Sequence, residues 1–207
     1  MKNFLYSLFI GLFGIAGLTS IAFLLMYAVQ SKQQAHLYSD LAAVREQDTQ
    51  QETASEPEKQ ASYQNLYLEN ADMIGWIQIE GTGIDYPVMQ TPADPNYYLK
   101  HDFEKHYTDY GCPFMQASCD ALAPSDNLII YGHNMKDGSM FADLAKYRSK
   151  NFWQAHKTVW FDTALGSCAY EIFAVIHTTV QVDSADAFPF YRFVDAATPE
   201  DFADYVS

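Results

Sequence analysis

The chain opens with a continuous apolar run. Residues 3–31 contain no charged side chain and consist mostly of Leu, Ile, Phe, Ala and Gly. The run is longer than the roughly 20 residues that an apolar helix needs to cross a bilayer. The apolar core of a signal peptide is shorter, about 7–15 residues. The pattern therefore predicts one uncleaved transmembrane helix over residues 1–31.

The next stretch is polar and rich in Gln, Ala, Glu, Ser and Asp. Residues 35–42 could extend the helix out of the membrane. Residues 46–60 have almost no apolar side chain except Ala and include Pro57, which is typical of a mobile linker. We expect residues 32–62 to form a spacer in front of a folded domain over residues 63–207.

Short runs with the composition of β-strands follow. Residues 76–79 and 84–89 are separated by Glu-Gly-Thr-Gly and predict a β-hairpin. Its second strand should lie at an edge or carry a bulge, because Pro87 cannot donate a hydrogen bond to a neighbouring strand. Further strands are expected at residues 112–116, 128–130, 158–163 and 170–180, the last two forming a second hairpin around Gly166.

The predicted helices of this domain are brief. Apolar residues repeat at helical spacing over residues 140–147. A second helix should begin at Thr198, which is followed by a proline at the first helical position and by acidic residues in the first turn. Many short strands with few helices favour a mostly-β barrel or sandwich, since a parallel α/β sheet needs longer helices between its strands.

Charge narrows the range of partners. The chain has a net charge of −14, and all 26 acidic residues but only 11 of the 12 basic residues follow the apolar run, so the remainder carries −15. This balance argues against a nucleic-acid partner and against a domain that lies flat on anionic lipid.

The three cysteines are too few for a disulfide framework and match no zinc spacing. Cys112 and Cys119 are close enough in sequence to pair outside the cell. Alternatively, all three are small buried hydrophobic residues, which we favour for Cys168. Cys119 has the most exposed sequence context. None of the three has a glycine-rich or helix-N-terminal setting that would lower its pKa, so each is interpreted as structural.

One histidine stands at the end of a predicted buried strand, in the sequence Tyr131-Gly132-His133-Asn134. A histidine in this place is held rigidly yet is open to a ligand, which suits proton transfer. The alternative is a strand-end residue that only hydrogen-bonds a loop. His101 and His106 lack the one-face spacing of a metal-binding pair, and we expect neither a metal nor a cofactor.

The order of these pieces resembles the class B sortases, and the resemblance covers residues 63–207 almost continuously. The anchor and the spacer in front of the domain also fit. The matching stretches are Asn-Ala-Asp-Met-Ile-Gly-Trp-Ile at 70–77, Ile-Asp-Tyr-Pro-Val-Met-Gln at 84–90, Asn-Tyr-Tyr-Leu at 96–99, His-Asp-Phe at 101–103, Asp-Asn-Leu-Ile-Ile-Tyr-Gly-His-Asn-Met at 126–135, Met-Phe-Ala-Asp-Leu at 140–144 and Tyr-Glu-Ile-Phe-Ala-Val at 170–175.

The resemblance implies a β-barrel enzyme anchored on the outer face of Gram-positive cells, with its domain extracellular. A cysteine would attack the threonine carbonyl of a C-terminal sorting motif in a secreted protein. An amine on a peptidoglycan precursor or a pilin would then resolve the thioester. His133 takes the position of the family's catalytic histidine. Asn134 and Met135 are weak candidates for lining the substrate groove.

The sequence departs from the family pattern in one respect. The family's nucleophile lies in a Thr-Leu-x-Thr-Cys strand, which is absent here, and neither Arg148 nor Arg192 matches its catalytic arginine. The family order places both groups beyond Ser207, so we expect an incomplete barrel that lacks its last strands. Two hypotheses follow: part of a class B sortase that is inactive alone, or a degenerate, non-catalytic, membrane-tethered binding module.

Overall fold

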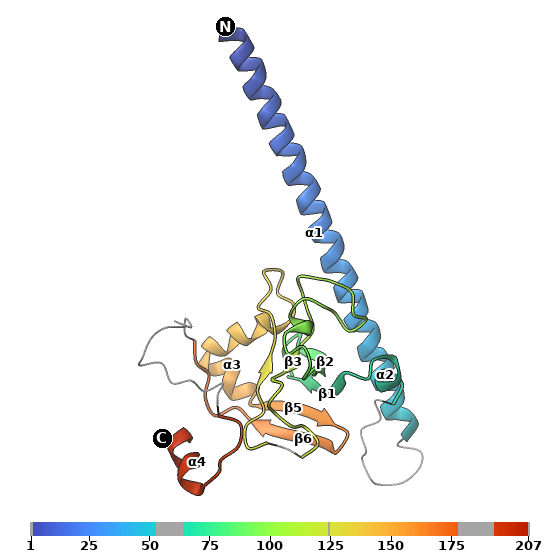
Figure 1. Cartoon of the computed structure of the whole chain (residues 1–207), viewed down its shortest axis with the longest axis vertical. Helices are drawn as coiled ribbons and strands as arrows, with labels where there is room; N and C mark the ends of the chain where they lie inside the picture. Colours follow the sequence, from blue (N-terminus) through green and yellow to red (C-terminus); the bar gives the residue numbers. More distant parts are fainter. Residues whose placement is uncertain (1, 53–63, 124, 178–192, 207) are drawn as a thin grey trace. The chain divides into compact units, whose positions relative to one another are not determined.

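The computed structural model of the chain describes residues 2–52, 64–123, 125–177 and 193–206 (Figure 1). The chain divides into two compact units, residues 1–40 and residues 41–207. The described part of the first unit is entirely helical and belongs to α1 (Lys2–Glu52). α1 contains one segment that is long and apolar enough to cross a membrane, which agrees with the prediction from the opening run.

α1 extends further than its composition suggests. The polar sequence predicts a mobile linker over residues 46–60, but the helix continues to Glu52. In the second unit, the guanidinium group of Arg45 binds Asp85 at 3.0 Å and Asp162 at 3.2 Å. These contacts hold the end of the helix in place, and no Pro or Gly interrupts it there. The rest of the expected linker lies outside the described residues.

The second unit is built from short strands and short helices around one sheet. The strands are β1 (Met73–Gln78), β2 (Asp85–Met89), β3 (Phe114–Met115), β4 (Ile130–Tyr131), β5 (Thr158–Thr163) and β6 (Gly166–Glu171). The helices are α2 (Gln64–Glu69), the 3₁₀ helices η1 (Tyr97–Leu99) and η2 (Phe141–Arg148), α3 (Lys150–Ala155) and α4 (Pro199–Val206).

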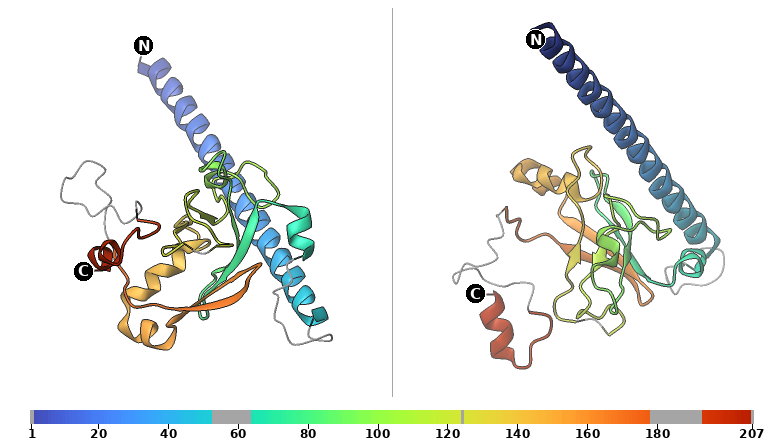
Figure 2. Two further views of the ribbon diagram at one scale, coloured as in Figure 1. Left: turned by 60° about the horizontal axis from the view of Figure 1, so that its bottom comes forward. Right: turned by 45° about the horizontal axis from the view of Figure 1, so that its top comes forward.

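The six strands form one sheet in the order β4-β3-β2-β1-β5-β6. All neighbours are antiparallel except β2 and β3. Figure 2 shows that the sheet curls rather than lying flat. Within the described residues β4 and β6 form its two edges, so the barrel is open. The arrangement confirms the predicted mostly-β fold with short helices.

Pro87 is accommodated in a different way from the one predicted. β2 is an inner strand, and the bulge falls on β1, between Met73 and Gly75. β3 pairs with β2 only at Met89, whose nitrogen donates to the carbonyl oxygen of Pro113 at 2.9 Å. Because strand nitrogens alternate in direction, the nitrogen of Pro87 faces the same side, two residues before β3 begins to pair. No hydrogen bond between strands is lost there.

Both predicted hairpins form, although the second is shorter than its composition suggests. β5 coincides with the predicted strand over residues 158–163, whereas β6 begins at Gly166 and ends at Glu171. The prediction of a strand over residues 170–180 is therefore wrong for residues 172–177, and residues 178–180 lie outside the described part of the chain. The nitrogen of Ile172 still donates to the carbonyl oxygen of Lys157 at 2.7 Å, but β5 begins at Thr158, which pairs with Glu171, so the composition of the residues that follow does not extend the strand.

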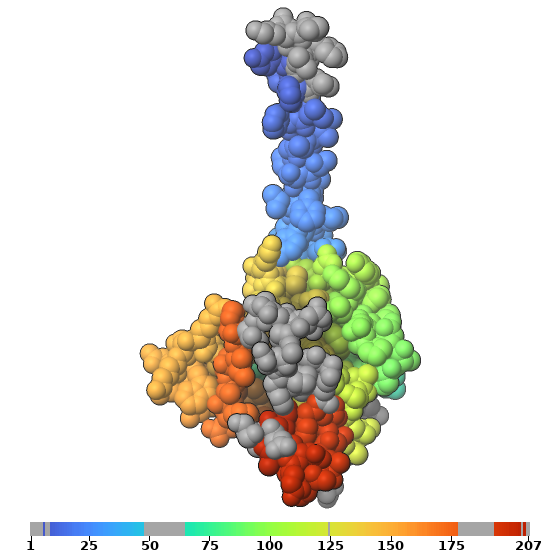
Figure 3. Space-filling model, turned by 60° about the vertical axis from the view of Figure 1, so that its left-hand side comes forward, coloured from blue at the N-terminus to red at the C-terminus, as the bar shows by residue number. Residues whose placement is uncertain are grey.

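The two predicted helices are present with local differences. The first is a 3₁₀ helix, η2, and α3 follows it after Ser149, whose hydroxyl caps α3 by accepting from the nitrogen of Phe152. α4 begins as predicted, because Thr198 and Asp201 form a reciprocal pair of side-chain-to-backbone hydrogen bonds of 2.9 and 3.2 Å. Figure 3 shows α4 at the surface of the second unit.

The core of the second unit lies around β1, β2 and the loops beside them. Burying each large apolar side chain contributes about 1.5–3 kcal/mol. The most buried side chains are Leu66, Trp76, Ile84, Val88, Met89, Tyr98, Tyr110, Met115 and Met140. Since Met140 and Tyr98 are among them, both the loop after β4 and η1 are fixed to the core.

Candidate active site

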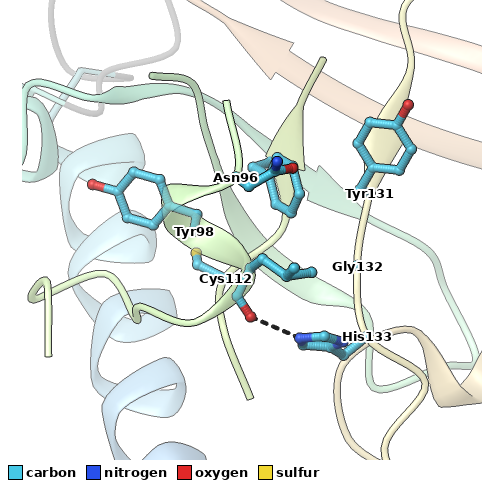
Figure 4. A pocket seen from close by; sticks show the side chains of 8 residues that line it. Asn96, Tyr98, Cys112, Tyr131, Gly132 and His133 are labelled. Atoms are coloured by element: carbon cyan, nitrogen blue, oxygen red, sulfur yellow. Dashed lines mark hydrogen bonds between the residues drawn. The ribbon is translucent and has the colours of Figure 1, made fainter. Parts of the chain in front are cut away.

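A cavity of about 270 Å³ opens between η1, β3 and the end of β4 (Figure 4). It is lined by Asn96, Tyr98, Leu99, Cys112, Phe114, Tyr131, Gly132 and His133. The lining is largely apolar with a few polar groups, which is the usual character of a ligand site. The predicted candidate His133 therefore lies in a pocket rather than on an open loop.

The backbone around His133 is fixed at both ends. Its carbonyl oxygen accepts a hydrogen bond from the nitrogen of Phe141 at 2.8 Å. The ring of Phe141 packs so closely on Gly132 that an added Cβ would lie 2.5 Å from it, so a larger residue would have to displace this ring. The nitrogen of Met140 is bound by the hydroxyl of Tyr86 at 3.1 Å. The loop after β4 is thus closed into a tight hairpin-like turn.

One imidazole nitrogen of His133 is hydrogen-bonded to the backbone. Nε2 lies 2.8 Å from the carbonyl oxygen of Leu99, the contact that is dashed in Figure 4. A carbonyl oxygen only accepts hydrogen bonds, so Nε2 must carry the hydrogen. In the neutral ring, Nδ1 is then the basic nitrogen. The group can exchange one proton through Nδ1 without losing its anchor.

The hydroxyl of Tyr98, a residue of η1 that lines the cavity, is held by two side chains that precede β1. This hydroxyl accepts from the side-chain amide of Asn70 at 2.8 Å and donates to Asp72 at 2.9 Å. Burial raises the pKa of Tyr98 well above its ordinary value. Burial would also raise the pKa of Asp72, but hydrogen bonds from Lys105 and Tyr98 outweigh it and hold that pKa below its ordinary value. This network keeps the turn that carries Leu99 in place.

The two weak groove candidates do not line this cavity. Asn134 is exposed and forms an isolated bridge with Met140, and Met135 is half-buried beside it. The cavity instead uses Asn96, Leu99 and Tyr131, which sequence reasoning did not single out. Asn96 and Leu99 lie in one of the stretches that carry the family resemblance. That resemblance was the sequence signal that could have identified them as cavity residues.

The burial of Cys119 and of Cys168 differs from what their sequence contexts predicted. Cys119, predicted to be the most exposed, is buried, and burial raises its pKa. Cys168, predicted to be buried, is exposed on β6. Cys112 is buried and directs its sulfur at the carbonyl oxygen of Pro87, 3.6 Å away. No disulfide joins Cys112 and Cys119 in the structure, so that alternative is not formed.

The other candidates give no second reactive cluster. Among the described residues there is no group of three His, Cys, Asp or Glu side chains that could hold a metal. His101 stacks on Tyr97 with ring centroids 3.9 Å apart, and His106 lies beside Glu104 at the surface. Arg148, which does not match the family's catalytic arginine, is exposed at the end of η2, and Arg192 lies outside the described residues.

The same fold and the same sequence order occur in characterised proteins. The chain is 37% identical over 183 residues to sortase B of Listeria monocytogenes, covering 87% of this chain and 70% of that protein. It is 33% identical over 119 residues to sortase B of Staphylococcus aureus, covering 58% of this chain and 48% of that protein. No family model matches the chain.

Solved structures agree with these relatives. A complex of Staphylococcus aureus sortase B with substrate superposes with a TM-score of 0.75 at 26% identity, covering 86% of this chain and 77% of that one. Sortase B from Listeria monocytogenes superposes with a TM-score of 0.60 at 39% identity, covering 70% and 78%. The chain belongs to the class B sortases, a family of transpeptidases.

Proposed function

We propose that the protein is a cysteine transpeptidase that cleaves a C-terminal sorting motif of secreted proteins. It would join them to an amine of a peptidoglycan precursor or of a pilin. Membership of the class B sortases supports the reaction class. A substrate complex of a similar fold supports a sorting-signal peptide as the ligand.

The observation that carries this proposal is the position of His133. Its imidazole lines the cavity, is held through Nε2 by the carbonyl oxygen of Leu99, and keeps Nδ1 for proton exchange. In the proposed reaction His133 protonates the amine that leaves and then takes a proton from the amine that enters. General acid–base catalysis of this kind contributes about 10²–10⁴-fold to a rate.

None of the chain's three thiols fits the nucleophile of this reaction. A nucleophilic thiol needs access and a lowered pKa. Cys112 lines the cavity but is buried and points at Pro87, and Cys119 is buried with a raised pKa. Cys168 is exposed but lies on β6, at the edge of the sheet opposite β4. We therefore propose that residues 1–207 alone form no acyl-enzyme.

We further propose that residues 1–31 anchor the protein in the cell membrane and that the domain over residues 63–207 works outside the cell. The apolar helix supports the anchor. An extracellular position follows from the proposed substrates, since both the sorting signal and the acceptor amine are met at the cell wall.

A substitution in the natural gene tests the function in the cell. Replacing His133 by alanine should move at least one protein from the cell-wall fraction to the medium, to the same extent as deletion of the gene, as measured by proteomics of the two fractions. His106→Ala, a change at an exposed histidine, is the matched control and should leave the distribution unchanged.

The result would also decide between the proposed enzyme and a non-catalytic tether. If deletion of the gene releases wall proteins but His133→Ala does not, the protein acts as a membrane-tethered binding module and the proposed chemistry is wrong.

A further inference from the structure

The structure points to Gly111 as a positioning residue for His133, acting through the carbonyl group of Leu99. We propose that Gly111 allows this carbonyl to approach Nε2 and thereby directs all proton exchange of His133 to Nδ1. The inference deepens the function proposed above and rests on it. It assigns to Gly111 a role in fixing the histidine.

The direction of proton exchange follows from the hydrogen bond itself. Nε2 of His133 lies 2.8 Å from the carbonyl oxygen of Leu99. Because this oxygen can only accept, Nε2 keeps its hydrogen in both the neutral and the protonated ring. Nδ1 is then the atom that gains and loses the proton. The same bond stops the ring from turning about its axis, so the basic nitrogen stays in one place.

The carbonyl group is placed by backbone contacts with a distant segment. On one side of Leu99, the oxygen of Tyr98 accepts from the nitrogen of Cys112 at 2.9 Å. On the other side, the oxygen of Lys100 accepts from the nitrogen of Thr108 at 2.9 Å. The carbonyl of Leu99 lies between these two bound carbonyls and is the one that reaches the histidine. Two hydrogen bonds therefore fix the peptide that presents it.

Gly111 lies directly against this peptide. Its φ of +61° is in the left-handed region that favours glycine. A Cβ at this position would lie 2.5 Å from the oxygen of Tyr98 and 2.8 Å from the oxygen of Leu99. Both neighbours are backbone atoms, which cannot rotate away as a side chain can. A larger residue at position 111 would therefore press on the carbonyl that holds His133, and one of the two backbone segments must shift.

A matched pair of glycine variants separates this effect from a general loss of stability. Gly111→Ala introduces both the strain of a positive φ and the clash with the Leu99 carbonyl. Gly138→Ala introduces the strain alone, since Gly138 has a φ of +89° and no atom within 4 Å of the added Cβ. Gly138 also lies in the loop that follows His133, which makes it a demanding control.

The test uses the full chain in detergent micelles with ¹⁵N-labelled histidine, observed by NMR above the pH at which the imidazole is protonated. The wild type should give a His133 Nε2–H signal that is protected from exchange with water, assigned by its absence in His133→Phe. Gly111→Ala should lose this protected signal, whereas Gly138→Ala should keep it. A signal that is equally protected in both variants, or absent from the wild type, would overturn the proposal.

A second measurement applies even if Gly111→Ala does not fold. The ¹³C carbonyl signal of Leu99 should differ between the wild type and His133→Phe. Phenylalanine keeps a planar ring but has no N–H donor. No shift would refute the hydrogen bond on which the proposal depends.

The two proposals can fail separately. If His133→Ala abolishes wall anchoring but no protected Nε2–H exists, only the role of Gly111 and Leu99 is wrong. If the signal behaves as expected but His133→Ala leaves anchoring unchanged, the proposed function is wrong.

Discussion

Substitution of Arg45 tests whether the end of α1 is part of the folded second unit or only a tether. Its guanidinium group bridges Asp85 and Asp162 at 3.0 and 3.2 Å and lies 5.3 Å from the ring centroid of Trp76. The indole nitrogen of Trp76 also donates to Asp85 at 2.6 Å. The side chains of Arg45 and Asp162 are only 16% and 9% exposed. The cluster thus joins α1, β1, β2 and β5.

The loss of stability expected for Arg45→Ala can be worked out from this burial. At an effective dielectric constant of about 20, two unit charges about 3 Å apart attract by roughly 5 kcal/mol. Desolvation offsets much of this gain, but removing one partner of a buried pair destabilises by about 3–5 kcal/mol, because the other charge is left behind. Asp85 is 36% exposed and can regain water, so we place Arg45→Ala at the lower end, about 3 kcal/mol.

The assay is urea unfolding of the full chain in detergent, followed by the fluorescence of Trp76, Trp153 and Trp160, all of which lie in the second unit. Arg148→Ala, at an exposed arginine, is the control and should change the free energy of unfolding by less than about 0.5 kcal/mol. In a double-mutant cycle, Asp162→Asn should be much less destabilising once Arg45 is absent. A loss below about 1 kcal/mol for Arg45→Ala, or additive effects of the two substitutions, would refute a structural role for this helix end.

Three further predictions concern particular side chains. Iodoacetamide should label Cys168 in the native chain well before Cys119, which is buried with a raised pKa; equal rates would contradict the observed burial. Because the folded-state pKa of Asp72 is lowered, its stabilising contribution is complete above its unfolded pKa of about 4 and is lost as the pH falls through the folded value. Asp72→Asn should therefore destabilise the protein to urea more near pH 7 than near pH 3, whereas an equal effect at both would argue against this linkage. Thr198→Ala should lower the stability of α4 by about 1 kcal/mol, measured by amide exchange, while Thr198→Ser should not, since only the hydroxyl is needed to bind Asp201.

Local sequence signals predicted the elements whose stability is local. The glycine-containing loop between two alternating runs predicted the β1–β2 hairpin, and the Thr-Pro-Glu-Asp start predicted α4. In these cases the residues that determine the structure lie within a few positions of one another. The family resemblance extended this to the fold as a whole, which no local pattern could specify.

The predictions that were wrong share a different cause: the structure at those positions depends on residues that are distant in the sequence. The apolar run after β6 does not continue as a strand, because strand length depends on a neighbour and not on composition alone. The helix beyond Arg45 is held by residues 40 and 117 positions away. The exposures of Cys119 and Cys168 were likewise reversed by tertiary packing.

The candidate site was predicted only in part for the same reason. The strand-end position singled out His133, but its hydrogen-bond partner is Leu99, 34 residues earlier in the chain. No periodicity indicates which carbonyl will face a given imidazole. Asn134 and Met135 were chosen because they are next to His133 in sequence, whereas the cavity is lined from η1 and β3.

The most direct test of the central claim is the rate at which the product of the natural gene, purified from its own membranes, transfers a fluorescent sorting-signal peptide to an amine. If His133 is the general acid and base, His133→Ala should slow transfer by about 10²–10⁴-fold, which corresponds to roughly 3–5 kcal/mol of transition-state stabilisation. His106→Ala should transfer at the wild-type rate. A His133→Ala protein that transfers the peptide within about twofold of the wild-type rate would contradict the account.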